Sequence, residues 1–511
     1  MLAKVLSYGL VGIEAYLIEI EVDVRQGLPS INFVGLPDQA TRESKDRIKC
    51  AINNSGFKYP SDRITVNLAP ADVPKSGPAF DLPIALGILA SSSQINQEAL
   101  DDFVLLGELS LDGAIRAIKG SLPIAMAMRS EKESPRKLIL PEINACEAGI
   151  IEEIQAFGLK NLKETVHFLS EQDTVTATRL NIKQAMNDTA YPFDFQEVKG
   201  QNLAKRALEV AVAGSHNVLM IGPPGSGKTM LAKRIPGILP DITLEEALET
   251  TQIHSSLGLV AERLGLITRR PFYAPHHTIS DVAMVGGSQI PQPGEISLAH
   301  NGVLFLDELP EFRRNVLEAL RQPLEEGKIK ISRIHKSLSF PAKFMLVAAM
   351  NPCPCGFYTD PHKQCRCNTT KIERYLSKIS GPLLDRMDIH IEVPAIKYKE
   401  LTSGDNPESS SAIKERVKKA RDIQLKRFQS DSIFANSHMN HKQIKKYCAL
   451  TPEGQDLLKC AIEELGFSAR AYDKVLKVSR TIADLDESEN ILPEHISEAI
   501  QYRSLDRQLW A

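Results

Sequence analysis

The chain has 511 residues, which is enough for about three domains of ordinary size. Its formal net charge of −3 and pI near 6.5 exclude a globally basic coat for nucleic acid, so any DNA contact needs a local patch or an assembled channel. The first residues alternate apolar with charged side chains, which excludes a secretory signal, and no apolar run approaches membrane-spanning length. We therefore expect a cytoplasmic protein with no membrane partner, whose eight cysteines are reduced unless they bind metal.

Four regions follow one another along the chain. Residues 1–170 mix short strand-like runs with helical segments, which predicts one α+β domain. Residues 171–193 are polar and weakly periodic, which predicts a linker. Residues 194–395 carry the nucleotide-binding motifs, and the helical pattern of residues 396–511 predicts a helical lid domain.

A phosphate-binding loop follows the apolar run 217–221 and precedes a helix-like segment. This order of strand, glycine-rich turn and helix directs backbone N–H groups and the positive helix end toward phosphate oxygens. Lys228 can then reach the β- and γ-phosphates, and Thr229 can hold Mg²⁺; a glycine turn that only happens to precede Lys-Thr is the alternative. The predicted ATP-binding residues are Gly222, Pro223, Pro224, Gly225, Ser226, Gly227, Lys228 and Thr229.

Two adjacent histidines, His276 and His277, come next along the chain. Neighbours in an extended segment point to opposite faces, and no carboxylate or cysteine is obviously spaced to join them. The sequence therefore disfavours a metal site at this pair.

The apolar run 302–306 ends in two carboxylates, Asp307 and Glu308. Such a strand downstream of a phosphate loop suits a Walker B element, in which Asp307 completes the Mg²⁺ shell and Glu308 orients the attacking water. Solvated turn carboxylates are the alternative. The pair predicts an ATPase rather than a passive nucleotide-binding protein.

Residues 327–340 alternate as two strands around the basic tip 333–336, which predicts a β-hairpin. In a six-fold ring such tips would form a positive collar around a phosphate backbone and bind DNA without sequence preference. An edge hairpin whose lysines prevent aggregation is the alternative.

Four of the eight cysteines form two closely spaced pairs. Four soft ligands in a reducing compartment fit a tetrahedral structural Zn²⁺ site. His362 could replace one sulfur, and unmetallated thiols are the alternative. The candidate zinc ligands are Cys353, Cys355, Cys365 and Cys367.

Further segments resemble the AAA+ superfamily. The strand-like run 344–350 ends in Asn351, which matches the polar sensor that helps to position the attacking water. The segment 382–388 is similar to the arginine-finger segment of the chelatase and replicative-helicase branch, which implies that Arg386 reaches the γ-phosphate of a neighbouring subunit in a ring. Arg470 matches a second sensor, which implies contact with the phosphates. For either arginine alone, a surface salt bridge is the more common role, so both assignments depend on the motifs around them.

Two more segments share this resemblance. Residues 198–207 are similar to the segment that packs against adenine in the superfamily. Residues 270–300 resemble the insert that projects into the ring pore of magnesium-chelatase-type AAA+ proteins, with a plain connecting loop as the alternative. The implied pore-facing candidates are Met284, Val285, Gly286 and Gly287.

The N-terminal domain resembles the proteolytic domain of Lon-type proteases, at residues 74–81 and 107–113. A protease of this kind needs a serine nucleophile and a lysine that activates it. Ala79 and Leu122 stand at the two positions in this sequence. The resemblance thus implies a Lon-protease-like domain without the Ser-Lys dyad, which is not a protease but a scaffold for ring assembly or DNA contact.

The order of domains resembles the ComM/YifB family over essentially the full length. The implied fold class is α/β: an AAA+ P-loop ATPase core with a helical lid domain and an N-terminal α+β Lon-protease-like domain. The resemblance implies a homo-hexameric, ATP- and Mg²⁺-dependent DNA motor that acts on single-stranded or branched recombination intermediates, as in natural transformation. A magnesium-chelatase-like ATPase subunit or a protein-remodelling AAA+ ATPase is the alternative.

Overall fold

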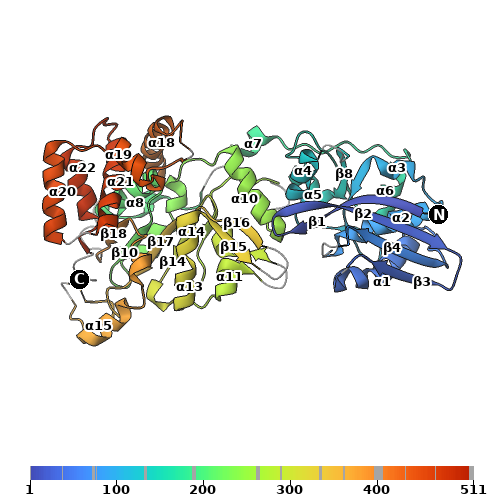
Figure 1. The fold of residues 1–511 in the computed structure, drawn as a ribbon, viewed down its shortest axis with the longest axis horizontal. Helices are drawn as coiled ribbons and strands as arrows, with labels where there is room; N and C mark the ends of the chain where they lie inside the picture. Colours follow the sequence, from blue (N-terminus) through green and yellow to red (C-terminus); the bar gives the residue numbers. More distant parts are fainter. Residues whose placement is uncertain are drawn as a thin grey trace. The chain divides into compact units, whose positions relative to one another are not determined.

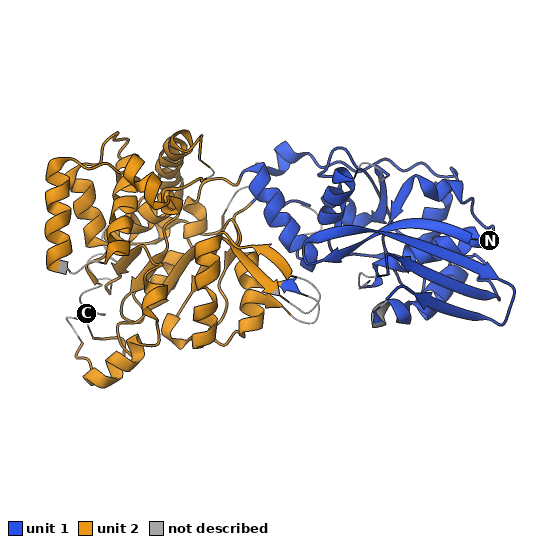
Figure 2. Ribbon diagram, in the orientation of Figure 1, with its two compact units in different colours: residues 1–188, 243–268, 289–292 blue, residues 189–242, 269–288, 293–511 orange. Residues whose placement is uncertain are grey.

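The computed structural model describes residues 2–36, 38–71, 75, 77–131, 135–186, 191–260, 265–287, 291–332, 337–358, 360, 363–395, 407–431, 433–465 and 468–505. The chain divides into two compact units (Figure 2). Unit 1 comprises residues 1–188, 243–268 and 289–292, and unit 2 comprises residues 189–242, 269–288 and 293–511. Residues 243–268, which follow the phosphate-binding loop, thus belong to the N-terminal unit.

A seven-stranded mixed sheet forms the centre of unit 1, in the order β3-β4-β2-β1-β5-β8-β9. β2 pairs antiparallel with β1 and β4, and the other neighbours pair parallel. In β2 the side chains of Ile18, Ile20 and Val22 are buried and alternate with more exposed ones, as in a strand with one covered face. The strands are β1 (Leu2–Val11), β2 (Glu14–Arg25), β3 (Ser30–Val34), β4 (Arg63–Ala69), β5 (Phe103–Leu105), β8 (Lys137–Pro141) and β9 (Gln155–Leu159), with a separate pair β6 (Glu108–Leu109) and β7 (Ile115–Arg116).

The helices of unit 1 cover this sheet. α2 is buried along its whole length and packs on β1 and β2. α10 packs against α4, so a helix from beyond the phosphate-binding loop completes the N-terminal unit. The helices are α1 (Gln39–Asn54), α2 (Asp81–Ser91), α3 (Glu98–Asp101), α4 (Ser121–Ser130), α5 (Glu142–Ala148), α6 (Leu162–Leu169), α7 (Ile182–Met186) and α10 (Leu244–Leu257). Among its described residues, the predicted linker contains the short helix α7.

Unit 2 is built on a five-stranded sheet in the order β11-β14-β17-β10-β18, with all neighbours parallel. Every residue of β10, β14 and β17 is buried, because helices cover both faces of a parallel sheet and its strands become continuously apolar. The α/β class of the core is thereby confirmed. The strands are β10 (Val218–Ile221), β11 (Phe272–Tyr273), β14 (Val303–Leu306), β17 (Met345–Met350) and β18 (Ile389–Glu392), with short strands β12 (Gly286–Gly287) and β13 (Gln292–Pro293) outside it.

Helices around this sheet include α8 (Asn202–Gly214), α9 (Lys228–Ala232), α11 (Asp281–Val285), α12 (Glu295–Leu298), α13 (Arg314–Ala319), α14 (Arg321–Glu326), α15 (Thr369–Leu376) and α16 (Gly381–Leu384). The C-terminal part is helical, as predicted, and its helices are coloured brown to red in Figure 1. Its helices are α18 (Ser410–Arg427), α19 (His441–Tyr447), α20 (Pro452–Leu465), α21 (Ala469–Leu485) and α22 (Pro493–Gln501). α8, α18 and α21 pack together, so the lid helices share one apolar core with the sheet.

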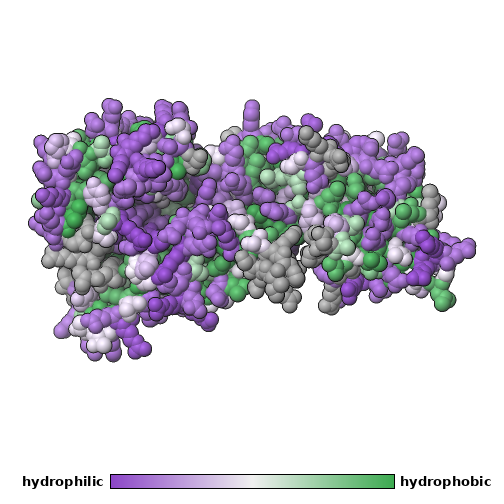
Figure 3. All heavy atoms as spheres, viewed as in Figure 1, coloured by the Kyte–Doolittle hydropathy of each residue, from purple (hydrophilic) through white to green (hydrophobic). Residues whose placement is uncertain are grey.

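The predicted hairpin is confirmed: β15 (Lys328–Ser332) pairs antiparallel with β16 (Ser337–Pro341). Its basic tip, residues 333–336, lies outside the described residues. On the face drawn in Figure 3 the surface is mostly hydrophilic, with hydrophobic residues scattered over it. Within the described ranges, no helix is long and apolar enough to cross a membrane.

Candidate nucleotide site and cysteine cluster

The structure places residues 222–227 between β10 and α9, in the strand-loop-helix order that a phosphate-binding loop needs. Gly227 caps α9 with φ of 89°, a left-handed conformation that favours glycine. The Nζ of Lys228 donates to the carbonyls of Gly222 at 2.8 Å and Pro223 at 2.9 Å. Burial lowers the pKa of Lys228, and the charge of Asp307 opposes that shift. The ammonium thus rests on loop carbonyls that phosphate oxygens can replace.

Asp307 lies at the carboxyl end of β14 and approaches the first turn of α9. The Thr229 hydroxyl donates to Asp307 Oδ2 at 2.6 Å, and the other carboxylate oxygen accepts from the Glu308 N–H at 2.9 Å. A hydroxyl and a carboxylate beside a phosphate loop are the hard oxygen donors that Mg²⁺ prefers. Thr229 and Asp307 therefore fit the predicted role of Mg²⁺ ligands.

Asn351 follows β17, which lies between β10 and β14 in the sheet. Because the carboxyl ends of parallel strands meet at one edge, this order brings Asn351 between the phosphate loop and the Walker B carboxylates. Its Oδ1 lies 3.3 Å from Lys228 Nζ.

Glu308 has a neighbour that sequence reasoning missed. Its Oε2 lies 3.4 Å from His277 Nδ1, and the adjacent ring of His276 lies against His277 with centroids 4.1 Å apart and planes tilted by 34°. Glu308 adopts φ of 54°, so its backbone turns sharply at the end of the strand. The histidine pair therefore lies beside the candidate catalytic carboxylate, and the two adjacent histidines were the only available signal.

The segment predicted to pack against adenine also reaches the loop. Gln201 begins α8 in a left-handed conformation with φ of 53°. Its side-chain amide donates to the backbone carbonyl of Ser226. This contact ties the start of α8 to the phosphate-binding loop.

Arg386 lies at the other edge of the sheet, which the amino ends of the strands form. Asn217, which precedes β10, donates from its side-chain amide to the Arg386 carbonyl at 2.9 Å. Arg386 is therefore at the amino end of β10, whereas the phosphate-binding loop follows the carboxyl end. Its guanidinium pairs with Glu325 and donates to the Pro382 carbonyl at 2.6 Å.

Arg470 shares that edge with Arg386. Its Nη1 lies 3.1 Å from Oδ2 of Asp385, the residue that precedes Arg386 in the chain. Burial and the neighbouring charge of Arg470 lower the pKa of Arg386. The structure thus groups the two arginines with each other and not with Lys228.

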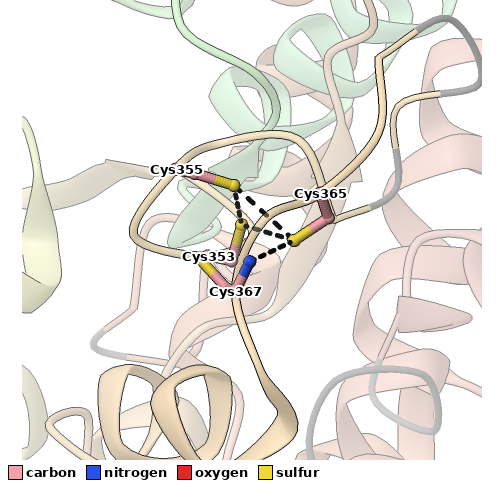
Figure 4. Close-up of side chains that lie close together, drawn as sticks. All are labelled: Cys353, Cys355, Cys365 and Cys367. Atoms are coloured by element: carbon pink, nitrogen blue, oxygen red, sulfur yellow. Dashed lines mark hydrogen bonds between the residues drawn. The ribbon is translucent and has the colours of Figure 1, made fainter.

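The cysteine cluster consists of Cys353, Cys355, Cys365 and Cys367 (Figure 4). The Sγ atoms of Cys353, Cys355 and Cys365 are 3.3 to 3.7 Å apart, and all four lie within 4.8 Å of one another. The Cys367 N–H donates to Cys365 Sγ at 3.4 Å. Burial disfavours the thiolate of Cys355, but bonds from the backbone N–H groups of Arg366 and Phe357 outweigh it and lower its pKa to about 6. His362, the predicted substitute ligand, lies outside the described residues.

In unit 1, the positions of the missing protease dyad are filled by apolar residues. Ala79 lies in a short 3₁₀ turn, residues 78–80, and Leu122 is fully buried in α4. Neither side chain can act as a nucleophile or a base.

One pore-facing prediction is wrong. Met284 is fully buried in α11, because this short helix packs on α12 and α13. Its side chain is therefore part of the core. Val285, Gly286 and Gly287 are half-buried and stay candidates.

Comparison with known proteins agrees with this architecture. Residues 194–401 match the family model described as "Magnesium chelatase, subunit ChlI", residues 20–144 match "Subunit ChlI of Mg-chelatase", and residues 407–503 match "Magnesium chelatase, subunit ChlI C-terminal". Lon protease 2 of Bacillus subtilis is 27% identical over 31% of this chain and 30% of its own length, which fits the Lon-like N-terminal unit.

Two relatives match almost end to end. Competence protein ComM of Haemophilus influenzae is 46% identical over 99% of this chain and 98% of its own length. The protein YifB of Escherichia coli is 45% identical over 98% of this chain and 96% of its own length. The AAA+ core, the helical lid and the Lon-like unit thus occur together in all three chains, and the chain belongs to the ComM/YifB family of magnesium-chelatase-like AAA+ proteins, whose type implies ATPase activity.

Proposed function

We propose that this protein is a homo-hexameric, ATP-dependent DNA motor of the helicase or branch-migration type, which acts in the cytoplasm on single-stranded or branched recombination intermediates, as in natural transformation. One observation carries the proposal: the candidate ATP-binding residues and the candidate arginine finger lie at opposite edges of one sheet. Lys228, Asp307 and Asn351 lie at the carboxyl edge, and Arg386 lies at the amino edge.

A single chain with this arrangement does not complete its own site. β10 has 4 residues and spans roughly 13 Å, with the phosphate-binding loop after it and Arg386 beside the residue before it. Arg386 can therefore serve a nucleotide only on another copy of the chain. A head-to-tail contact of this kind closes into a ring when the rotation allows it.

Each residue at the carboxyl edge has a distinct part in the proposed hydrolysis. Lys228 binds phosphate oxygens, and Asn351 and Glu308 hold and polarise the water for in-line attack. Mg²⁺, when bound by Thr229 and Asp307, neutralises charge on the phosphates. Arg386 of the neighbouring copy stabilises the charge that develops on the transferred group, and Arg470 lies where it can assist on the same side.

The DNA part of the proposal is supported by the hairpin and by family membership. Along β15 exposed and buried side chains alternate: Lys328 and Lys330 are exposed, whereas Ile329 and Ile331 are buried. This alternation presents the lysines to solvent on one side of the hairpin, where they can contact a phosphate backbone. The relative ComM is named as a competence protein.

A second candidate is a chelatase-like or protein-remodelling ATPase. The match of residues 194–401 to the magnesium chelatase model favours it. The two candidates differ in whether DNA stimulates ATP hydrolysis.

The test is steady-state ATP hydrolysis with and without single-stranded and branched DNA, with strand displacement from a three-strand junction followed in the same reactions. Wild type is compared with Glu308→Gln. Turnover that DNA stimulates, that moves the junction and that is lost in the variant supports the motor. Turnover that is indifferent to DNA would refute it in favour of the second candidate.

The cysteine cluster is part of the proposal as a structural Zn²⁺ site. A tetrahedral site with Zn–S bonds of about 2.3 Å has sulfurs roughly 3.8 Å apart. The observed separations of 3.3 to 3.7 Å are close to that edge length. Cys353, Cys355, Cys365 and Cys367 would supply four thiolates and no open position, which is the composition of a structural rather than a catalytic zinc site.

A further inference from the structure

The cysteine cluster is joined to the nucleotide site at both of its ends. Before it, Cys353 follows Asn351 by two residues, and Asn351 Oδ1 lies 3.3 Å from Lys228 Nζ. After it, α15 leads to Lys378, whose Nζ lies 3.2 Å from Oε2 of Glu311, three residues after Glu308. The chain therefore leaves the nucleotide site at Asn351 and comes back beside it at Lys378.

The middle of this loop lies against the phosphate-binding loop. Gly356, which follows Cys355, has φ of 84° and sits where a Cβ would overlap the Cδ atom of Pro224. Its N–H donates to the Cys353 carbonyl at 2.9 Å, which turns the chain tightly between the first pair of cysteines and Pro224. Glycine is required here by both the backbone angle and the close approach.

We propose that Zn²⁺ bound by the cysteine cluster sets the shape of the nucleotide site, so that ATP binding by this chain depends on zinc. The inference rests on the proposed ATPase site and adds a metal dependence to it. The physical reason is that the loop has few other constraints: of the four ligands only Cys353 is buried, and the other three are partly exposed. Four Zn–S bonds hold such a loop in one conformation, whereas four thiols do not.

With zinc bound, Gly356 supports Pro224 and the loop keeps Asn351 beside Lys228. Without zinc, the loop loses its cross-link between Cys355 and Cys365, and both contacts lose their support. The phosphate-binding loop is then no longer held in one conformation. ATP must order the loop when it binds, which lowers the affinity for ATP.

The first test compares Cys365→Ser with Cys460→Ser in the full-length chain. Cys365 contacts Cys353 and Cys355 through sulfur, whereas Cys460 is exposed on α20 and serves as the matched control. Zinc per chain is measured by metal analysis, and the affinity for a fluorescent ATP analogue is measured by titration. We expect about one zinc per chain in wild type and in Cys460→Ser. Cys365→Ser should lose zinc, and its affinity for the ATP analogue should fall at least about tenfold.

The second test separates the metal from the contact that it supports. Gly356→Ala leaves all four thiols in place but forces a methyl group into Pro224. We expect it to retain zinc and to bind the ATP analogue roughly tenfold more weakly. Gly27→Ala is the control, because Gly27 is exposed and the atom nearest to an added Cβ, Arg63 Cβ, is 3.4 Å away. Thermal unfolding of each variant shows that the fold is retained.

Wild-type protein without zinc would overturn the inference. So would Cys365→Ser that has lost zinc and still binds the analogue with wild-type affinity. Because the readout is binding and not turnover, failure of the proposed motor is visible separately: zinc-dependent ATP binding without hydrolysis or DNA stimulation would refute the motor and support the zinc dependence.

Discussion

The two edges of the parallel sheet in unit 2 carry different kinds of site. At the carboxyl edge, Lys228 contacts Asn351 at 3.3 Å, and Thr229 contacts Asp307 at 2.6 Å. At the amino edge, Arg386 and Arg470 contact acidic residues of their own chain, Glu325 and Asp385. The carboxyl edge is assembled within one chain. At the amino edge, the partners that the two arginines have among the described residues are nearby carboxylates and carbonyls of the same chain.

Under the proposed function, the carboxyl edge binds the nucleotide and the amino edge activates hydrolysis. The carboxyl edge has every group needed to hold a nucleotide, so binding should require one chain. The arginines can stabilise a transition state only when a second chain presents its nucleotide to them. Substitutions at the two edges should therefore separate binding from turnover.

The largest effect is expected at the carboxyl edge, for Lys228→Ala. Removing the ammonium eliminates its charge-assisted contacts with phosphate, so ATP binding should weaken by about 100-fold and hydrolysis should fall to background. Titration with a fluorescent ATP analogue and a phosphate-release assay measure both. Lys233→Ala, an exposed lysine just after the same helix, is the matched control. Turnover of Lys228→Ala at the wild-type rate would show that the phosphate loop is assigned wrongly.

The amino edge should behave differently in Arg386→Ala. Its own nucleotide half-site is intact, so ATP affinity should stay within about threefold of wild type, while turnover falls by about 1,000-fold, as for other arginine fingers. The same two assays are used, with Arg25→Ala, an exposed arginine of unit 1, as the control. Unchanged turnover in Arg386→Ala would show that Arg386 is not an arginine finger.

A smaller effect is expected for His277→Ala at the carboxyl edge. Loss of the contact between His277 Nδ1 and Glu308 leaves the carboxylate free to rotate, and turnover should fall by about tenfold with ATP affinity unchanged. His276→Ala keeps the His277–Glu308 contact and should be less affected. Equal losses in the two variants would argue for a structural role of the histidine pair.

The smallest effect is expected for Glu325→Gln, which removes the carboxylate that holds Arg386 in the isolated chain. Glu325 is largely exposed and pairs of this kind contribute up to about 1 kcal/mol, so turnover should rise by no more than about fivefold. A loss of turnover would instead mean that Glu325 orients the finger. Rate measurements at several protein concentrations distinguish the two outcomes from a change in assembly.

Much of the carboxyl edge could be predicted from sequence, because its motifs are contiguous. The loop from Gly222 to Thr229 carries its strand, its turn and its helix in one stretch, and Asp307 and Glu308 directly follow an apolar run. The paired cysteines were visible for the same reason. Local spacing alone brings each of these groups together.

The remaining features depend on which strands are neighbours, which local spacing does not encode. Gly356 meets Pro224 because β17 lies beside β10, which brings the segment after Asn351 to the phosphate-binding loop. The burial of Met284 was missed because its short helix packs on α12 and α13, a contact that the pattern of residues 281–285 does not indicate. Likewise, nothing in residues 244–257 indicates that α10 completes the N-terminal unit, since its apolar face would suit either partner.

The central claim is that the two edges act on one nucleotide only when they come from two chains. The most direct measurement is ATP hydrolysis by a mixture of Lys228→Ala and Arg386→Ala chains, each inactive alone. In a mixed ring, an Arg386→Ala chain supplies the nucleotide site and a neighbouring Lys228→Ala chain supplies the arginine. We predict that mixing restores turnover, with a maximum near equal proportions. Mixed assemblies that form but show no turnover at any ratio would contradict the claim.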